Sequence, residues 1–161
     1  LVAGVLFLAF SLSLLPGMFG ARLGELDAYV PAASRAGGLA WMKNRYREAL
    51  TRARQENRRV FVAFTGYACT NCHWMKANMF TRPEVAAAMK EYVLVELYTD
   101  GTDEASPSNQ QFQQERFSTV AIPFYAILDP DEKVIATFAG LTRDSGVFLA
   151  FLQPHRRVSL S

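Results

Sequence analysis

The sequence has little of what most metal and cofactor sites are built from. Its 161 residues include two cysteines and two histidines, and the net charge is only +2. It contains no glycine-rich phosphate loop, no His/Glu metal signature and no internal repeat. A structural zinc site needs about four ligands, which two cysteines, His73 and the remote His155 supply poorly. The composition therefore gives no support for a protein that binds nucleotides, zinc or nucleic acid.

What remains is a chain of globular composition with an uneven charge distribution. Hydrophobic residues make up 50% of the sequence and aromatic residues 12%, which suits one domain with a sizeable core plus an appendage. Residues 43–59 include seven basic residues and two acidic ones, a local net charge of +5. We interpret this run as the solvated face of a helix rather than as a binding patch.

The two cysteines stand close together, in the segment Cys69-Thr70-Asn71-Cys72. They follow a β-rich run over residues 59–68 and precede an amphipathic helical pattern over residues 73–80. A pair at such a junction places the first sulfur at a helix N-terminus, where unpaired backbone N–H groups and the helix dipole stabilise a thiolate. The pattern therefore indicates a reversible dithiol–disulfide couple.

Two other interpretations of the cysteine pair stay open. Because His73 follows Cys72, the string also reads Cys-x-x-Cys-His, the attachment motif of c-type haem, with His73 and Met89 or another methionine as axial ligands. Small haem domains are mostly helical, however, whereas this pair follows a predicted strand. A purely structural disulfide is the second alternative, but a two-residue spacer closes too small a loop to stabilise the fold much.

The ends of the chain differ from its middle. The first 15 residues have no charge, and a Pro-Gly step at positions 16–17 ends the run, which is slightly shorter than the roughly 20 apolar residues that span a bilayer. We expect residues 1–20 to be the end of a transmembrane helix, with a buried core helix as the alternative. Residues 21–40 have the small-residue composition of a linker, and residues 154–161 form a C-terminal tail.

Between these ends, hydrophobic periodicity predicts alternating helices and strands. We expect helices over residues 41–57, 73–80, 81–92, 109–117 and 144–152, and strands over residues 60–64, 93–98, 121–128 and 133–138. Asp100, Asp103 and Glu104 fall in a polar loop without the spacing of a calcium site, so we expect them to be solvated. Strands separated by helices indicate parallel crossovers, and the last tight turn indicates an antiparallel pair. The prediction is an α/β domain with a four-stranded mixed sheet flanked by helices.

This order of elements, with the cysteine pair after the first strand and Ile122-Pro123 opening the third, resembles the thioredoxin fold. The stretch from Glu48 to Asn57 and the segment Val60-Phe-Val-Ala-Phe-Thr-Gly-Tyr-Ala-Cys-Thr-Asn-Cys72 resemble the C-terminal domain of DsbD-type transmembrane thiol:disulfide interchange proteins. The resemblance covers residues 41–153 as a domain, and residues 1–40 as its membrane anchor.

The resemblance implies a specific activity and location. Such a domain lies on the periplasmic side of the bacterial inner membrane, takes electrons from a cysteine pair in the membrane-embedded domain of the same protein, and passes them to a periplasmic thiol–disulfide partner. This implies that Cys69 is the attacking thiolate and Cys72 the resolving thiol, with no cofactor beyond their disulfide. Pro123 would be a cis-proline beside that disulfide. Ile122, Tyr67 and Ala68 would contact the partner chain, although Tyr67 and the nearby Trp74 would equally suit packing on the sheet edge.

The sequence also departs from the pattern of these relatives. Many of them have a buried acid six residues before the first cysteine, where this chain has Ala63, and some have an acid at the position of Lys76. A nearby ammonium group favours a thiolate, so we expect the Cys69 pKa to lie below the ordinary value of about 8.5. A thioredoxin-like docking module with vestigial cysteines remains a further alternative, which only an activity measurement excludes.

Overall fold

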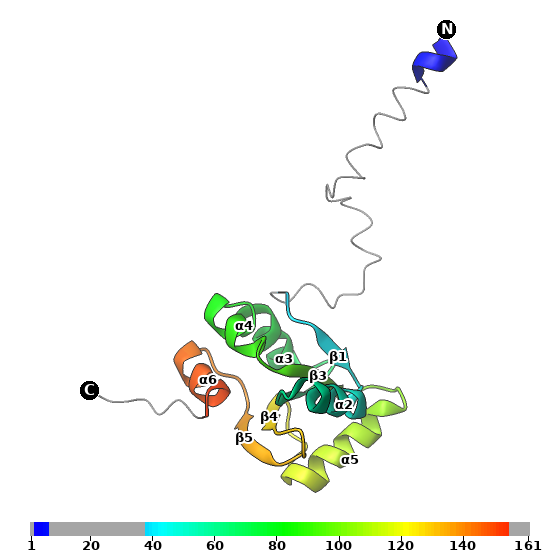
Figure 1. Cartoon of the computed structure of the whole chain (residues 1–161). Coiled ribbons are helices and arrows are strands. Elements are labelled where there is room, and N and C mark those ends of the chain that lie inside the picture. The colour runs from blue at the N-terminus through cyan, green and yellow to red at the C-terminus, as the bar shows by residue number, and fades with distance from the viewer. Residues whose placement is uncertain (1, 7–37, 155–161) are drawn as a thin grey trace, which may run out of the picture. The chain divides into compact units, whose positions relative to one another are not determined.

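The computed structural model describes residues 2–6 and 38–154 (Figure 1). Residues 2–6 are helical and belong to a unit of their own, residues 1–32, separate from the unit of residues 33–161. Within the described ranges, no helix has both the length and the apolar character needed to cross a bilayer. Most of the expected membrane segment 1–20, the linker 21–40 and the tail 154–161 lies outside the described residues, so these expectations stay predictions.

Residues 38–154 form a five-stranded mixed sheet with helices on both faces (Figure 1). The sheet order is β1-β3-β2-β4-β5. Strands β1, β3 and β2 run parallel, β4 is antiparallel to β2, and β5 is antiparallel to β4. In chain order the elements are β1 (Trp41–Lys43), α2 (Tyr46–Glu56), β2 (Val60–Thr65), α3 (Thr70–Trp74), the π-helix η3 (Met75–Met79), α4 (Pro83–Met89), β3 (Val93–Tyr98), α5 (Ala105–Phe117), β4 (Phe124–Leu128), β5 (Val134–Ala139) and α6 (Ser145–Leu152).

The central strands are apolar because they are covered on both faces. Every residue of β2, β3 and β4 is buried, as expected for inner strands between two layers of helices. On one face of the sheet, a hydrophobic core that contains Phe61 is formed with residues of α3, η3, α4 and α6. A second hydrophobic core contains Phe64 and is formed with residues of α2 and α5. The α/β class and the mixed sheet are thereby confirmed, whereas the expected count of four strands was wrong.

Several boundaries differ from the sequence-based expectation, and three of these differences concern β1, α5 and β4. Residues 41–43 pair with β3 as an additional edge strand, and the helix predicted over 41–57 begins only at Tyr46. Helix α5 begins at Ala105, four residues earlier than expected, in a polar stretch that lacks hydrophobic periodicity. Strand β4 begins at Phe124 rather than at residue 121, directly after the Ile122–Pro123 peptide, which is cis.

The sheet register brings three separate segments to one end of the domain. Parallel strands β2 and β3 pair Thr65 with Tyr98, so the residues after both strands emerge together. Antiparallel β4 pairs Phe124 with Phe64, so Pro123 enters the sheet at this same end. The cysteine segment, the residues after β3 and the proline loop therefore meet where β2 ends.

Candidate active site

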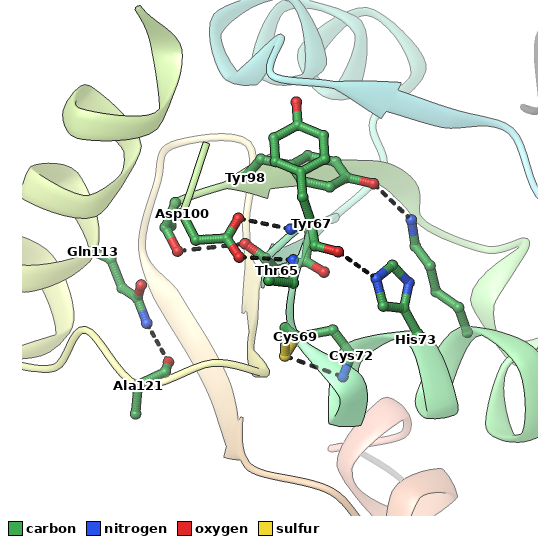
Figure 2. The surroundings of a disulfide bond; sticks show 12 residues. Thr65, Tyr67, Cys69, Cys72, His73, Tyr98, Asp100, Gln113 and Ala121 are labelled. Atoms are coloured by element: carbon green, nitrogen blue, oxygen red, sulfur yellow. Dashed lines mark hydrogen bonds between the residues drawn. A yellow bond between two sulfur atoms is a disulfide. The ribbon is translucent and has the colours of Figure 1, made fainter. Parts of the chain in front are cut away.

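Cys69 and Cys72 form a disulfide at the start of helix α3 (Figure 2). Cys69 is partly exposed, whereas Cys72 is buried, with 3% of its surface accessible. The backbone N–H of Cys72 donates to Cys69 Sγ at 3.2 Å, as expected for a sulfur that caps a helix. Cys69 is thus the residue of the pair that a partner sulfur can reach, whereas Cys72 is shielded from solvent.

The helix that carries the pair is anchored through its apolar face. Met75 and Met79 are fully buried in the same core that covers the sheet, and they share with Cys72 the inward side expected from the sequence. Trp74 packs against this core and lies under the Arg143 guanidinium, whose carbon is 5.6 Å from the ring centre. The rigid position of the cysteine pair follows from this anchoring.

The residue two positions before Cys69, Tyr67, is held at several of its atoms (Figure 2). Its ring stacks on Tyr98 with 4.1 Å between centroids, and its hydroxyl donates to Asp103 Oδ2 at 3.0 Å. Partial desolvation raises the Asp103 pKa, but hydrogen bonds from Tyr67 and Ser106 outweigh this and lower it. Tyr67 nevertheless remains 43% exposed, so its ring is available at the rim of the site.

His73, which follows Cys72, forms a hydrogen bond with the segment before Cys69. Its Nε2 lies 2.7 Å from the Tyr67 carbonyl oxygen, which only accepts, so this ring nitrogen donates (Figure 2). The haem interpretation would need His73 as a metal ligand and both cysteines as thioether attachments. In this domain the cysteines are joined to each other, the His73 Nε2 is engaged, and the fold is built around a sheet. These observations argue against the haem interpretation.

The proline loop lies against the end of β2, from which the cysteine segment emerges. The Ile122–Pro123 peptide is cis, as the resemblance implied. Pro123 is buried and Ile122 partly buried, and Gln113 Nε2 of helix α5 donates to the Ala121 carbonyl at 2.7 Å. A Cβ built on Gly66 would lie 2.7 Å from Ile122 Cδ1. The loop and the end of β2 are therefore in close approach.

Ala63 of β2 stands where many relatives have a buried acid, and the carboxylate of Glu96 lies on the neighbouring strand β3. Ala63 pairs in register with Glu96 of β3, and Glu96 is only 7% exposed. The Lys76 ammonium is bonded to the Glu96 carboxylate and donates to the Tyr98 hydroxyl at 3.3 Å. The sequence analysis expected Lys76 to favour a Cys69 thiolate as a nearby positive charge, and the pairing with Glu96 offsets that charge. The Cys69 pKa itself stays a prediction.

Three residues of the site were missed by the sequence analysis: Glu96, Asp100 and Gln113. Glu96 carried a signal, since it is the single charge inside an otherwise apolar strand. Asp100 was expected to be merely solvated, but it accepts the backbone N–H groups of Tyr67 and Ala68. Among residues 2–6 and 38–154, no group of three or more His, Cys, Asp or Glu side chains is placed to hold a metal ion.

A mixed sheet between helices, a Cys-x-x-Cys disulfide at a strand-to-helix junction and a cis-proline at the same end of the sheet define the class of thioredoxin-fold dithiol–disulfide sites. The family model described as thioredoxin-like matches residues 40–130, and the chain belongs to that family. The fold, the family and the cysteine pair together support thiol–disulfide oxidoreductase activity.

Solved structures with this fold include several disulfide oxidoreductases. The DsbH oxidoreductase is 19% identical over 77% of this chain and 87% of its own, with a TM-score of 0.60. A thioredoxin from Thermus thermophilus is 24% identical over 71% and 84%, with a TM-score of 0.59. The oxidised DsbD C-terminal domain of Neisseria meningitidis is 18% identical over 68% and 91%, with a TM-score of 0.56. At these identities the likeness shows the fold alone, and no curated protein sequence matches the chain.

Proposed function

We propose that this domain is a protein-disulfide reductase that relays electrons from a membrane-embedded cysteine pair to periplasmic protein disulfides. The observation that carries the proposal is the asymmetry of the disulfide, with Cys69 partly exposed and Cys72 buried beside a cis-proline loop. The residues from Val60 to Cys72, which resemble the DsbD-type C-terminal domain, support the finer assignment. That resemblance also supports a position on the periplasmic face of the bacterial inner membrane, anchored through residues 1–20.

The reduced domain would act by two successive exchanges. The Cys69 thiolate attacks one sulfur of the partner disulfide, so that a mixed disulfide forms and the other partner sulfur leaves as a thiolate that takes up a proton. Cys72 then loses its proton and attacks Cys69 Sγ, which reforms the Cys69–Cys72 disulfide and releases the partner as a dithiol. Two electrons pass to the partner. The membrane-embedded pair restores the dithiol by the same chemistry, and no nucleotide, flavin or metal takes part.

The surroundings of the pair suit a partner chain in extended conformation. Ile122 precedes the cis-proline and would offer its backbone groups to the partner, as in strand addition to a sheet edge. Tyr67 is exposed two residues before Cys69, and Ala68 adjoins Cys69. Together these three residues, with Pro123, would form the contact surface for the partner.

A redox titration of the Cys69/Cys72 pair tests the proposal. Thiol trapping and mass measurement across a dithiol buffer series should show a two-electron transition between about −200 and −270 mV, in the range of reductants. A midpoint near about −120 mV would instead make the domain an oxidant and reverse the proposed direction of electron flow. Cysteines that cannot be reduced or trapped would leave the alternative of a redox-inactive docking module.

A further inference from the structure

The main chain before Cys69 is held by a carboxylate that arrives from the end of β3. Asp100 Oδ1 accepts the backbone N–H of Tyr67 at 2.7 Å, and Oδ2 accepts the backbone N–H of Ala68 at 3.0 Å (Figure 2). A carboxylate has two acceptor oxygens and serves both donors at once, which the side chain of asparagine does not. Hydrogen bonds to an ionised acceptor are also roughly twice as strong as neutral ones.

Gly66 makes this close approach possible. A Cβ built on Gly66 would lie 2.4 Å from Asp100 Oδ2, a separation that real Cβ atoms do not adopt. The same Cβ would lie 2.7 Å from Ile122 Cδ1. The absence of a side chain at position 66 therefore lets the carboxylate and the proline loop both reach the end of β2.

We propose that Asp100 is a positioning residue for the exchange reaction: it fixes the Tyr67–Ala68 main chain, and its negative charge restrains thiolate formation at Cys69. This inference rests on the proposed function. Ala68 adjoins Cys69, and consecutive Cα atoms are about 3.8 Å apart, so the carboxylate lies within about 10 Å of the sulfur, one Debye length at about 0.1 M salt. At that separation the Coulomb repulsion is weakened by solvent and salt, but it still disfavours the ionised thiol.

Other charged groups also surround this segment. Asp103 accepts from the Tyr67 hydroxyl, the Lys43 ammonium lies 4.6 Å from the centre of the Tyr67 ring, and His73 donates to the Tyr67 carbonyl. The Lys76 ammonium is paired with Glu96. In the part of the chain that the structure describes, Asp100 is the side chain that binds the N–H groups of the two residues before Cys69. Asp103 is therefore the matched control, since it is a nearby acid without these bonds.

The test compares Asp100→Asn with Asp103→Asn in the reduced protein. Iodoacetamide alkylation of Cys69, followed from pH 5 to 10 by mass spectrometry, reports the thiolate fraction. Asp100→Asn should alkylate about three- to tenfold faster than the wild type at pH 7, from the loss of one charge in a partly solvated site. Asp103→Asn should stay within about twofold. Asp100→Glu, which keeps the charge, should return the rate towards the wild-type value.

Two outcomes overturn the inference: an Asp100→Asn rate equal to the wild type, or an equal rise in Asp103→Asn. If Asp100→Asn does not fold, Asp100→Ser supplies a second neutral acceptor for the same comparison. The rate of insulin disulfide reduction, with dithiothreitol as electron source, is measured in parallel. A wild-type protein that does not reduce insulin contradicts the proposed function, whereas alkylation still reports on Asp100, so the two failures are distinguishable.

Discussion

The loop that carries Cys69 and the loop that carries Pro123 meet at the same end of the sheet, but different chemistry holds each of them. The backbone before Cys69 donates to Asp100, a carboxylate on the exposed surface. The backbone before Pro123 accepts from Gln113, an amide with 0% of its surface accessible. One loop is thus held by an ionised group in contact with water, and the other by a neutral group inside the core.

This difference indicates a division of roles between the two loops. The Asp100 carboxylate carries a charge, so it acts on a nearby sulfur through its field as well as through its hydrogen bonds. A buried amide carries no net charge, so Gln113 affects the position of the loop without a comparable field. The contacts of the cysteine loop are therefore expected to affect the charge environment of Cys69 (the electrostatic side), whereas those of the proline loop are expected to affect the position of the loop backbone (the shape side).

The largest effect is expected from the cysteine loop itself. Cys69→Ser removes the sulfur that attacks the partner and should lower insulin reduction by at least about 1,000-fold. Cys72→Ser keeps that sulfur but removes the resolving thiol, so the mixed disulfide should accumulate and be visible by mass. Equal accumulation of mixed disulfide in both variants would contradict the assignment of Cys69 as the attacking residue.

A smaller effect is expected from the charge pair beneath the cysteine helix. Glu96→Ala leaves the Lys76 ammonium without its carboxylate in a site where Glu96 is 7% exposed, and it should lower the free energy of unfolding by about 2–4 kcal/mol. Glu48→Ala is the matched control, because its pair with Arg45 is solvent-exposed and should contribute under about 1 kcal/mol. Urea denaturation gives both values, and similar losses in the two variants would contradict the argument.

Most of the fold was predictable because its central strands are continuous apolar runs. The expected strands over 60–64 and 93–98 match β2 and β3 within one residue. Strand β1 was missed because three residues carry no periodicity of their own, and their pairing with β3 comes from a distant part of the chain. The first turn of α5 was missed because its residues Ala105–Ser108 are small residues and a proline, which give no apolar stripe.

The site was predictable only where it is local in sequence. The spacing of Cys69 and Cys72 indicated the redox pair directly, and the resemblance supplied the cis peptide before Pro123. Asp100 binds backbone groups that lie 33 and 32 positions earlier in the sequence. Gln113 binds a backbone carbonyl eight positions later. Their roles depend on the strand register and on the packing of α5, which no local pattern specifies.

The shape side of the comparison is tested by Gln113→Met. Methionine fills a similar volume but does not donate to the Ala121 carbonyl, so the proline loop should shift and the KM for insulin should rise about threefold or more. The free energy of unfolding should change by less than about 1 kcal/mol. The reason is that the lost bond is offset by removal of Gln113 Oε1, a buried oxygen without a partner among the described residues.

Gln114→Met is the control for that variant, since Gln114 lies next in the same helix and is exposed. It should leave both the KM and the stability unchanged. The rate of Cys69 alkylation should also stay at the wild-type value in Gln113→Met, because no charge has been altered. An unchanged KM in Gln113→Met would show that the amide does not position the loop.

The smallest effect is expected from Tyr67→Phe, which alters the electrostatic side without touching the backbone bonds of Asp100. The Tyr67 hydroxyl is one of the donors that lower the Asp103 pKa, so its removal should raise that pKa towards the ordinary value for aspartate. A carboxyl whose folded pKa is lowered adds stability above its unfolded pKa, and this stability is lost as the pH falls through the folded pKa. In Tyr67→Phe this contribution should therefore be smaller, and its loss should be complete at a higher pH. Carbon-detected NMR titration of the Asp103 carboxyl measures the change in its folded pKa directly. The stacked ring remains, so the alkylation rate of Cys69 should not change. A rise in this rate comparable to that of Asp100→Asn would mean that Tyr67, not Asp100, controls thiolate formation at Cys69.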